Sequence, residues 1–241
     1  RVLYVDKSAL SQYQRDDYLL IDPFRSHSDL REWAKGEPDL MCNRDGPIIC
    51  DRVDLGDSAP VLGNRFTLEA RFYFDGGRYG RGQLLGSESF RAPAISFHNH
   101  GKEIRYGFYT NNVVRGNRAI AINLNTRKAW HHVATTFDGT NYKLFLDGVE
   151  INNSTAFQGL TPPDTEPVRI IGNKPWVGKI DEVRMWSVAR TQAEIQANMN
   201  KTLADNETGL VAYYPMDVNN NWEIIDKTSN ANHAKITNAE I

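Results

Sequence analysis

Cysteine, net charge and long apolar runs are all scarce in this 241-residue chain. A formal net charge of −2, with no block of like charge, lacks the basic excess typical of nucleic-acid-binding proteins. No apolar run approaches the roughly 20 residues that a membrane-spanning helix needs. Cys42 and Cys50 can form one local disulfide or stay as two free thiols, and two cysteines cannot fix a redox compartment. We therefore predict neither nucleic acid as a partner nor a membrane span.

Paired carboxylates are also missing from the sequence pattern. A retaining glycosidase holds two carboxyl groups about 5–5.5 Å apart, which alternate positions of one strand can supply. Glu69 stands alone in its strand, and we expect the adjacent Asp181 and Glu182 to point to opposite faces of theirs. No Ser-His-Asp arrangement and no phosphate-binding glycine motif accompany them. The sequence therefore predicts a protein that is not an enzyme.

The histidines occur as two close pairs, His98 with His100 and His131 with His132. A transition-metal site would need further His or Cys ligands, and the sequence offers no such cluster. We interpret both pairs as hydrogen-bonded polar residues at a turn and on a sheet.

What the sequence does contain is strand-like alternation of side chains between two faces. In residues 129–148, Trp130, His132, Ala134 and Thr136 share one face of a predicted strand, and Asp-Gly pairs mark the two turns that follow. Residues 66–74 alternate in the same way, and we expect Phe72, Phe74, Trp130 and Trp186 in the core. Shorter strands are predicted near residue 53 and over residues 94–97, 104–109, 168–171 and 177–186.

The spacing of apolar residues changes once, after Trp186, from the two-residue period of a strand to that of a helix. Thr191 and Glu194 form a capping box, and apolar residues then follow at helical spacing. We predict one helix over about 191–203 and a closing strand over about 210–216. Many strands with one late helix indicate an all-β fold, a two-sheet antiparallel sandwich. Residues 1–50 are irregular and too short for a core of their own, so we expect an N-terminal extension packed on a main domain of residues 51–241. The start at Arg1, without a signal-like stretch, suggests a mature or excised piece.

Four segments resemble the concanavalin A-like lectin/glucanase superfamily, in its laminin-G/pentraxin-like form. They are DRVDLGDSAPVLGNRFTLEARFYFD, AWHHVATTFDGTNYKLFLDGVEI, VGKIDEVRMWSVARTQAEIQANM and GLVAYYPMD. The resemblance covers about residues 50–241 and implies a curved jelly roll. The last segment often opens such a domain, whereas here it stands near the C-terminus. It either closes this same sandwich or belongs to a longer tandem protein.

The resemblance also implies a structural calcium ion. Calcium takes several oxygen ligands, and the positions that match the family are Asp181 and Asp217, with Asp226 and Asp57 as weaker candidates. The alternative is that these aspartates cap turns and pair with neighbouring Arg or Lys.

A glycan site combines an aromatic ring with hydrogen-bonding side chains. The residues that suit this role are Trp176, Tyr109, Asn111, Arg105 and His98, although packing in the fold is the more common role for the two aromatic residues. We predict a non-catalytic, secreted or cell-surface recognition module that is lectin-like or adhesive. The alternatives are a protein–protein interaction or structural module and, third, a glycan-active hydrolase or lyase. An oligomer and a place in a longer multidomain chain both stay open.

Overall fold

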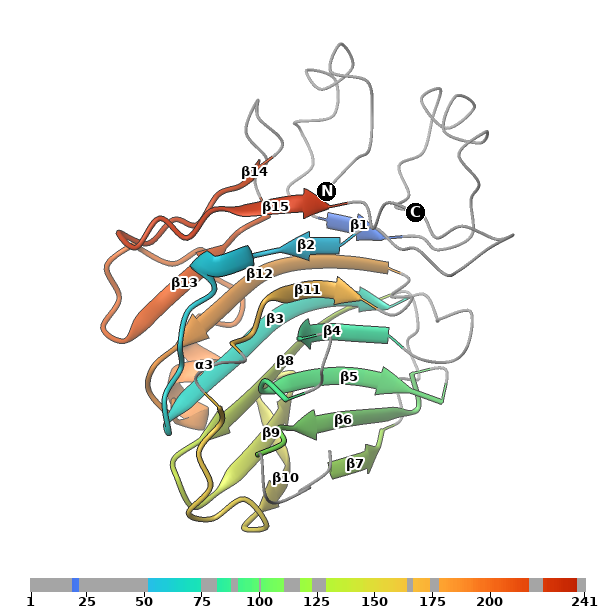
Figure 1. Ribbon diagram of the computed structural model, residues 1–241. Helices are drawn as coiled ribbons and strands as arrows, with labels where there is room; N and C mark the ends of the chain where they lie inside the picture. Colours follow the sequence, from blue (N-terminus) through green and yellow to red (C-terminus); the bar gives the residue numbers. More distant parts are fainter. Residues whose placement is uncertain are drawn as a thin grey trace.

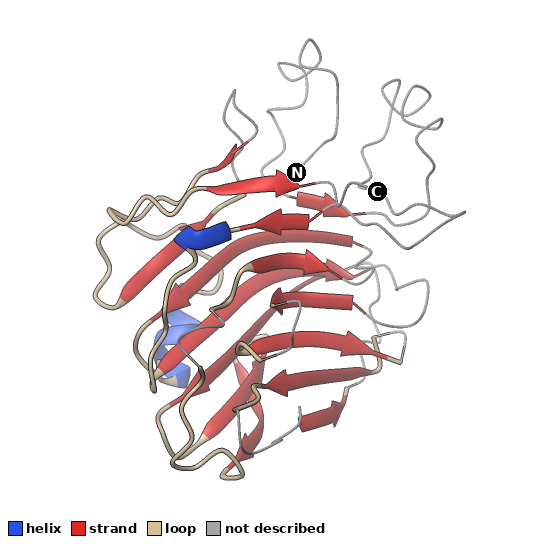
Figure 2. Cartoon of the chain, in the orientation of Figure 1, coloured by secondary structure: helices blue, strands red, loops and turns tan. Residues whose placement is uncertain are grey.

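The computed structural model describes residues 19–21, 52–74, 82–87, 91–99, 101–110, 118–122, 129–163, 167–173, 178–216 and 223–237. Within these segments the chain forms two antiparallel sheets that face each other, as Figure 1 shows. Strands make up most of the described part, and the one α-helix lies at the side (Figure 2). The predicted all-β, two-sheet antiparallel jelly-roll sandwich is confirmed.

The first sheet, sheet A, has the order β1-β12-β3-β8-β9-β10, and β13 also pairs with β12. Its strands are β1 (Leu19–Ile21), β3 (Phe66–Phe74), β8 (Trp130–Phe137), β9 (Tyr142–Leu146), β10 (Val149–Ser154), β12 (Gly178–Trp186) and β13 (Leu210–Tyr214). The predicted alternation in β3 and β8 is confirmed, because Leu68, Phe72 and Val133 enter the core while Glu69 and His132 face the other way.

The second sheet, sheet B, has the order β14-β15-β2-β11-β4-β5-β6-β7. Its strands are β2 (Arg52–Asp54), β4 (Gly82–Gly86), β5 (Ala94–His98), β6 (Glu103–Gly107), β7 (Arg118–Ala121), β11 (Ile170–Asn173), β14 (Glu223–Ile224) and β15 (Ala234–Thr237). A short 3-10 helix, η2 (Gly56–Ser58), follows β2.

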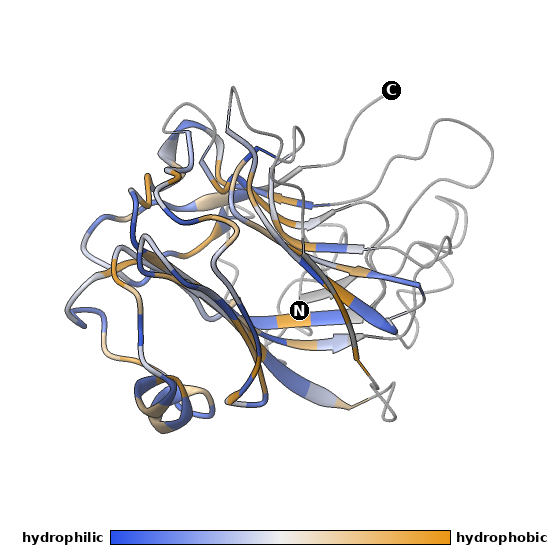
Figure 3. Ribbon diagram, turned by 90° about the horizontal axis from the view of Figure 1, so that it is seen from below, coloured by the Kyte–Doolittle hydropathy of each residue, from blue (hydrophilic) through white to orange (hydrophobic). Residues whose placement is uncertain are grey.

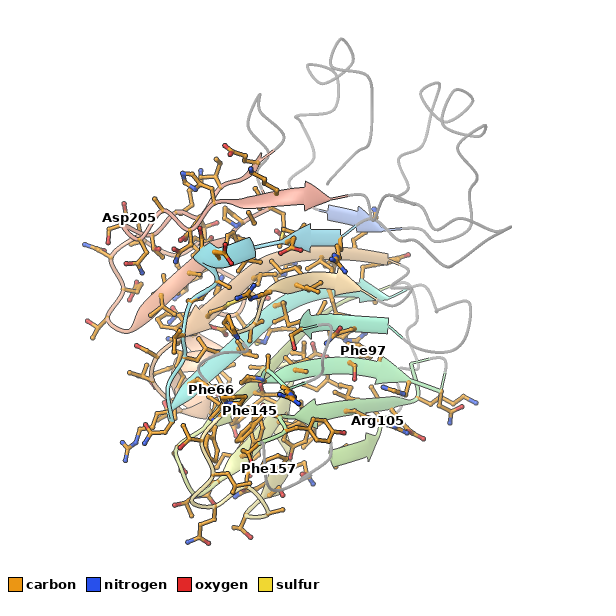
Figure 4. The ribbon with its side chains drawn as sticks, in the orientation of Figure 1. Phe66, Phe97, Arg105, Phe145, Phe157 and Asp205 are labelled. Carbon is orange, nitrogen blue, oxygen red and sulfur yellow. The ribbon has the colours of Figure 1, made fainter. Side chains whose placement is uncertain are left out.

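Aromatic rings fill the space between the two sheets. Phe66 packs edge-on against Tyr142, with 5.5 Å between ring centroids, and Phe108 lies 5.1 Å from Phe157. These side chains are fully buried, as is Phe97 from sheet B. Figure 4 labels Phe66, Phe97 and Phe157 within the sandwich. Because both sheets contribute rings to one continuous cluster, the core holds the two sheets in a fixed relation.

The C-terminal segment completes both sheets of this same sandwich. β13 pairs with β12 in sheet A, and the β14–β15 hairpin adds to β2 in sheet B. The closing strand predicted over 210–216 is therefore present as β13. Near the other end of the chain, β1 pairs with the first half of β12. The rest of residues 1–50, with Cys42 and Cys50, lies outside the described residues, so the domain boundary at residue 50 stays a prediction.

The helix α3 (Gln192–Asn198) is shorter than the predicted span of 191–203. It begins as predicted, because Thr191 and Glu194 form the capping box. It ends early because the buried Arg184 donates to the carbonyl of Asn198 at 3.0 Å and also to the carbonyl of Lys201. A side chain that binds these carbonyls replaces the next helical turn.

One apolar side chain fixes α3 on the outer face of sheet A. Ile195 is buried against Ala134 and Phe145, on the side of the sheet that faces away from sheet B. Seen from below and coloured by hydropathy, α3 is mostly polar, with the two curved sheets beside it (Figure 3). No helix in the described part of the chain is long and apolar enough to cross a membrane.

Candidate functional site

The β5–β6 hairpin brings together two of the predicted ligand-binding residues. In its register Ser96 pairs with Arg105, and His98 pairs with Glu103. Phe97 and Ile104, on the alternate positions, are buried in the core. His98, Glu103 and Arg105 therefore lie together on the outer face of sheet B. We call these three residues the hairpin site.

Side-chain contacts hold the hairpin site in one arrangement. Ser96 Oγ lies 3.2 Å from His98 Nε2, and Arg105 Nη2 donates to Glu103 Oε2 at 3.4 Å. The Arg105 side chain is 40% exposed and that of Glu103 is 29% exposed. Ser96, in contrast, is buried. The polar groups that a ligand can reach are thus an imidazole, a carboxylate and a guanidinium, and Figure 4 labels Arg105 among them.

This combination suits a ligand rich in hydroxyl groups. The carboxylate accepts hydrogen bonds, the guanidinium donates them, and the imidazole can do either. Arg105 Nε is also buried and has no hydrogen-bond partner within the part of the chain that the structure describes. Glu103 was not among the predicted residues. The hairpin register could have identified Glu103, because it pairs this residue directly with His98.

The predicted aromatic partner is less well placed. Tyr109 is half-buried and lies two residues beyond the end of β6, on the same side of the extended chain as Arg105. Four residues of extended chain separate the two by about 13 Å. Tyr109 could therefore meet a ligand of two or more sugar rings, but not the ring that Arg105 binds. Trp176 and Asn111 lie outside the described residues.

The three predicted calcium ligands that the structure describes, Asp57, Asp181 and Asp226, are not brought together. Asp57 lies in η2, where its fully exposed side chain is 3.5 Å from Arg169. Asp181 lies in β12 of the other sheet, 3.6 Å from Arg71. Among the described residues no three His, Cys, Asp or Glu side chains converge as metal ligands.

Asp226 has a structural role in the loop between β14 and β15. Its Oδ1 accepts hydrogen bonds from the backbone N–H groups of Tyr213 and Thr228, and its Oδ2 accepts from the Thr228 hydroxyl and the Asn232 N–H. Donors thus occupy both oxygens, which leaves them poorly suited to a cation. The described aspartates do not fit one shared calcium site. Because Asp217 lies outside the described residues, calcium stays an untested prediction.

A β-bulge in β12 overturns the prediction that Asp181 and Glu182 point to opposite faces. The pairing with β3 shifts between Asp181 and Arg184, and Glu182 adopts a φ of 51°. An extra residue in the left-handed region puts two neighbouring side chains on one face. Asp181 meets Arg71 and Glu182 meets Arg184, both on the outer face of sheet A.

Neighbouring groups determine the charge of Asp181. Burial, together with the adjacent Glu182, raises the pKa of the Asp181 carboxyl to about 6, although Arg71 acts in the opposite direction. Glu182 is held by two partners: it accepts from the Tyr213 hydroxyl at 2.9 Å and from Arg184 Nη2 at 2.5 Å. Asp181 is therefore a carboxyl group that changes charge near neutral pH.

Glu69, another carboxylate on this face, is 0% exposed. Its Oε1 accepts from Trp186 Nε1 at 2.6 Å and from Arg190 at 3.4 Å, while its Oε2 lies 3.2 Å from His132 Nε2. Burial opposes ionisation, but His132 and the nearby arginines outweigh it and lower the pKa of the Glu69 carboxyl. With all these partners and no exposure, Glu69 is a structural anion beneath α3.

The fold and the hairpin site together define a jelly-roll domain with a polar, half-open face. A family model described as the concanavalin A-like lectin/glucanases superfamily matches residues 50–196, and the chain belongs to this superfamily. The resemblance in the sequence is thus confirmed.

Individual proteins match more loosely. Pappalysin-1 of Mus musculus is 29% identical over 107 residues, which is 41% of this chain and 6% of that protein. A Bacteroides ovatus structure, named as a candidate carbohydrate-binding protein, is 21% identical with a TM-score of 0.60, covering 80% of this chain and 58% of its own. The heptameric SAP-like pentraxin of Limulus polyphemus is 12% identical with a TM-score of 0.48, covering 66% of this chain and 80% of its own. The chain thus spans about three fifths of the Bacteroides protein and a small part of pappalysin-1.

Proposed function

We propose that this domain is a non-catalytic extracellular recognition module that binds carbohydrate at the hairpin site. The observation that carries the proposal is the register of β5 and β6, which gathers His98, Glu103 and Arg105 on one half-open sheet face. A carboxylate and a guanidinium fixed 3.4 Å apart offer paired acceptors and donors. Neighbouring hydroxyl groups of a sugar ring present the complementary pair.

Two further observations support a lectin-like module. The chain belongs to a superfamily of lectins and glucanases, and a Bacteroides ovatus protein of similar fold is named as a candidate carbohydrate binder. Laminin-G-like domains are typically extracellular, which supports the proposed location. The rigid core beneath the hairpin fits repeated weak contacts, the usual mode of glycan recognition by such modules.

A glycan panel followed by calorimetry tests the proposal. The protein is screened against neutral and charged oligosaccharides, and the best ligand is titrated into the wild type and Arg105→Gln. Loss of a charge-assisted hydrogen bond of about 1.5 kcal/mol predicts about tenfold weaker binding for Arg105→Gln.

Lys143→Gln is the matched control. Lys143 pairs with Glu150 at 2.9 Å, with exposures of 33% and 31%, so it resembles Arg105 in burial and partner but lies in sheet A. Equal affinities for the wild type and Arg105→Gln would refute the hairpin site, and the absence of binding across the panel would refute carbohydrate recognition. Capture of a protein partner in place of a glycan would support the alternative of a protein-interaction module.

A further inference from the structure

A second polar surface lies on the outer face of sheet A, across the core from the hairpin site. Three strands place its residues side by side: Lys179 pairs with Tyr73, and Tyr73 pairs with Trp130. In the neighbouring row, Asp181 pairs with Arg71. We call these five residues the ring–cation patch. Trp130 was predicted to lie in the core, which is wrong: it is half-buried on the opposite face of the sheet.

The two rings of the patch each have a cation nearby. Lys179 Nζ lies 5.7 Å from the centroid of the Tyr73 ring, and Arg71 Cζ lies 5.4 Å from that of Trp130. The two ring centroids are 6.1 Å apart at an interplanar angle of 65°. Cation–π contacts and strand register therefore hold the rings in place before any ligand arrives.

All five side chains stay partly accessible. Lys179, Tyr73, Trp130, Arg71 and Asp181 are each half-buried, whereas Glu69 and Trp186 on the same sheet face are buried beneath α3 and its flanking loops. The Arg71 side chain is 33% exposed, and its Nη1 is the atom that lies 3.6 Å from Asp181. A guanidinium has five N–H donors, so this pair leaves donors on Arg71 for a ligand.

We propose that the ring–cation patch is a second saccharide site, which takes an acidic sugar. The rings of Tyr73 and Trp130 offer apolar surface to the C–H groups of a pyranose. Among the described residues of the patch, Arg71 and Lys179 carry positive charge and Asp181 carries the carboxyl group, so the patch favours an anionic group on that sugar. The hairpin site, with one cation and one carboxylate, lacks this excess of positive charge.

Titration with two matched ligands tests this site. Tetragalacturonic acid carries a carboxylate on each ring, and its methyl ester is the neutral counterpart. The acid binds the wild-type protein, and the ester binds at least about fivefold more weakly, as expected for the loss of two partly exposed charge contacts. The double variant Arg71→Gln/Lys179→Gln removes that difference.

The variant Trp130→Leu tests the contribution of the aromatic rings. It lowers the affinity for tetragalacturonic acid about tenfold if one ring contributes a stacking contact of ordinary size. Lys143→Gln, also in sheet A and similar in exposure to Arg71, leaves the affinity unchanged. The hairpin site is tested separately by Arg105→Gln with its own ligand from the glycan panel, so either site can fail without the other. Failure of the acid to bind, equal binding of acid and ester, or unaltered binding by the double variant would each overturn the proposal.

Discussion

Replacing Asp181 by asparagine is expected to stabilise the protein at neutral pH. Burial and Glu182 raise the pKa of this carboxyl from 3.8 to about 6. The native state therefore binds a proton more tightly than the unfolded state does. The stability that this proton contributes is complete below pH 3.8 and is lost as the pH rises through about 6. Above that pH, the folded protein holds a charged Asp181 that the unfolded chain accommodates more easily.

The magnitude follows from the size of the shift. A pKa raised by about two units destabilises the folded protein by about 3 kcal/mol at pH values above the pKa of Asp181 in both the unfolded and the folded state. The Asp181 side chain is only 14% exposed, so solvent screens little of this energy. Asparagine keeps an oxygen in the place of Oδ1, which accepts from the Glu182 N–H at 2.9 Å. We therefore expect Asp181→Asn to gain about 2–3 kcal/mol at pH 8, or about 5–10 °C in Tm.

Urea denaturation of the wild type and Asp181→Asn from pH 4 to pH 8 provides the measurement. The two free energies of unfolding converge near pH 4 and separate progressively up to about pH 7. Asp57→Asn is the control, because Asp57 is fully exposed and its replacement leaves stability unchanged at every pH. A variant that is less stable than the wild type at pH 8, or a difference independent of pH, would refute the reasoning.

Three further substitutions test how the structure is held together. Arg184→Met leaves the Glu182 carboxylate without its buried partner and should lower the free energy of unfolding by about 3–5 kcal/mol; a loss below about 1 kcal/mol in urea denaturation would contradict this. Thr191→Ala removes the N-cap of α3 and should lower Tm through a loss of about 1 kcal/mol, whereas Gln192→Ala at an exposed position should not. For Asp138, burial is outweighed by hydrogen bonds from Asn141, which lower its pKa; Asp138→Asn should therefore be less stable than the wild type at pH 7. That difference should shrink as the pH falls through the lowered pKa, and a difference that does not change with pH would count against this assignment.

The local patterns in the sequence predicted most of the strands. Alternation in residues 66–74 and 130–137 recurs in β3 and β8 because one side of each strand must meet the core. Asp147 and Gly148 turn the chain between β9 and β10 with φ angles of 50° and 75°, which glycine and aspartate tolerate better than most residues. These signals are local, so a single sequence displays them.

The misplaced predictions all depend on contacts between distant residues. Helix α3 stops at Asn198 because Arg184, 14 residues earlier in the chain, donates to its carbonyl. Glu182 occupies a bulge, although glutamate has no preference for a positive φ. Likewise, Trp130 fits the strand pattern whichever sheet face it occupies, and only the register with β3 places it outside the core.

Parts of the predicted sites were found because hairpins are local. His98 and Arg105 share a face through a β5–β6 turn that the sequence itself predicts. The calcium candidates, in contrast, were chosen by resemblance. Asp57, Asp181 and Asp226 lie in separate parts of the fold, and the resemblance does not specify the hydrogen bonds that occupy Asp226.

Helix α3 divides the outer face of sheet A into two regions of similar chemistry and different use. Beneath the helix and its flanking loops, the Arg190 guanidinium lies 3.9 Å from the Trp186 ring and 3.4 Å from Glu69, and all three are buried. Beside the helix, Arg71 meets Trp130 and Asp181 in the same way but stays half-exposed. Residue type alone therefore cannot tell a structural cluster from a binding surface. Burial makes the difference, because α3, fixed by Ile195, packs on Ala134 next to the fully buried Glu69, whereas Trp130 is half-buried.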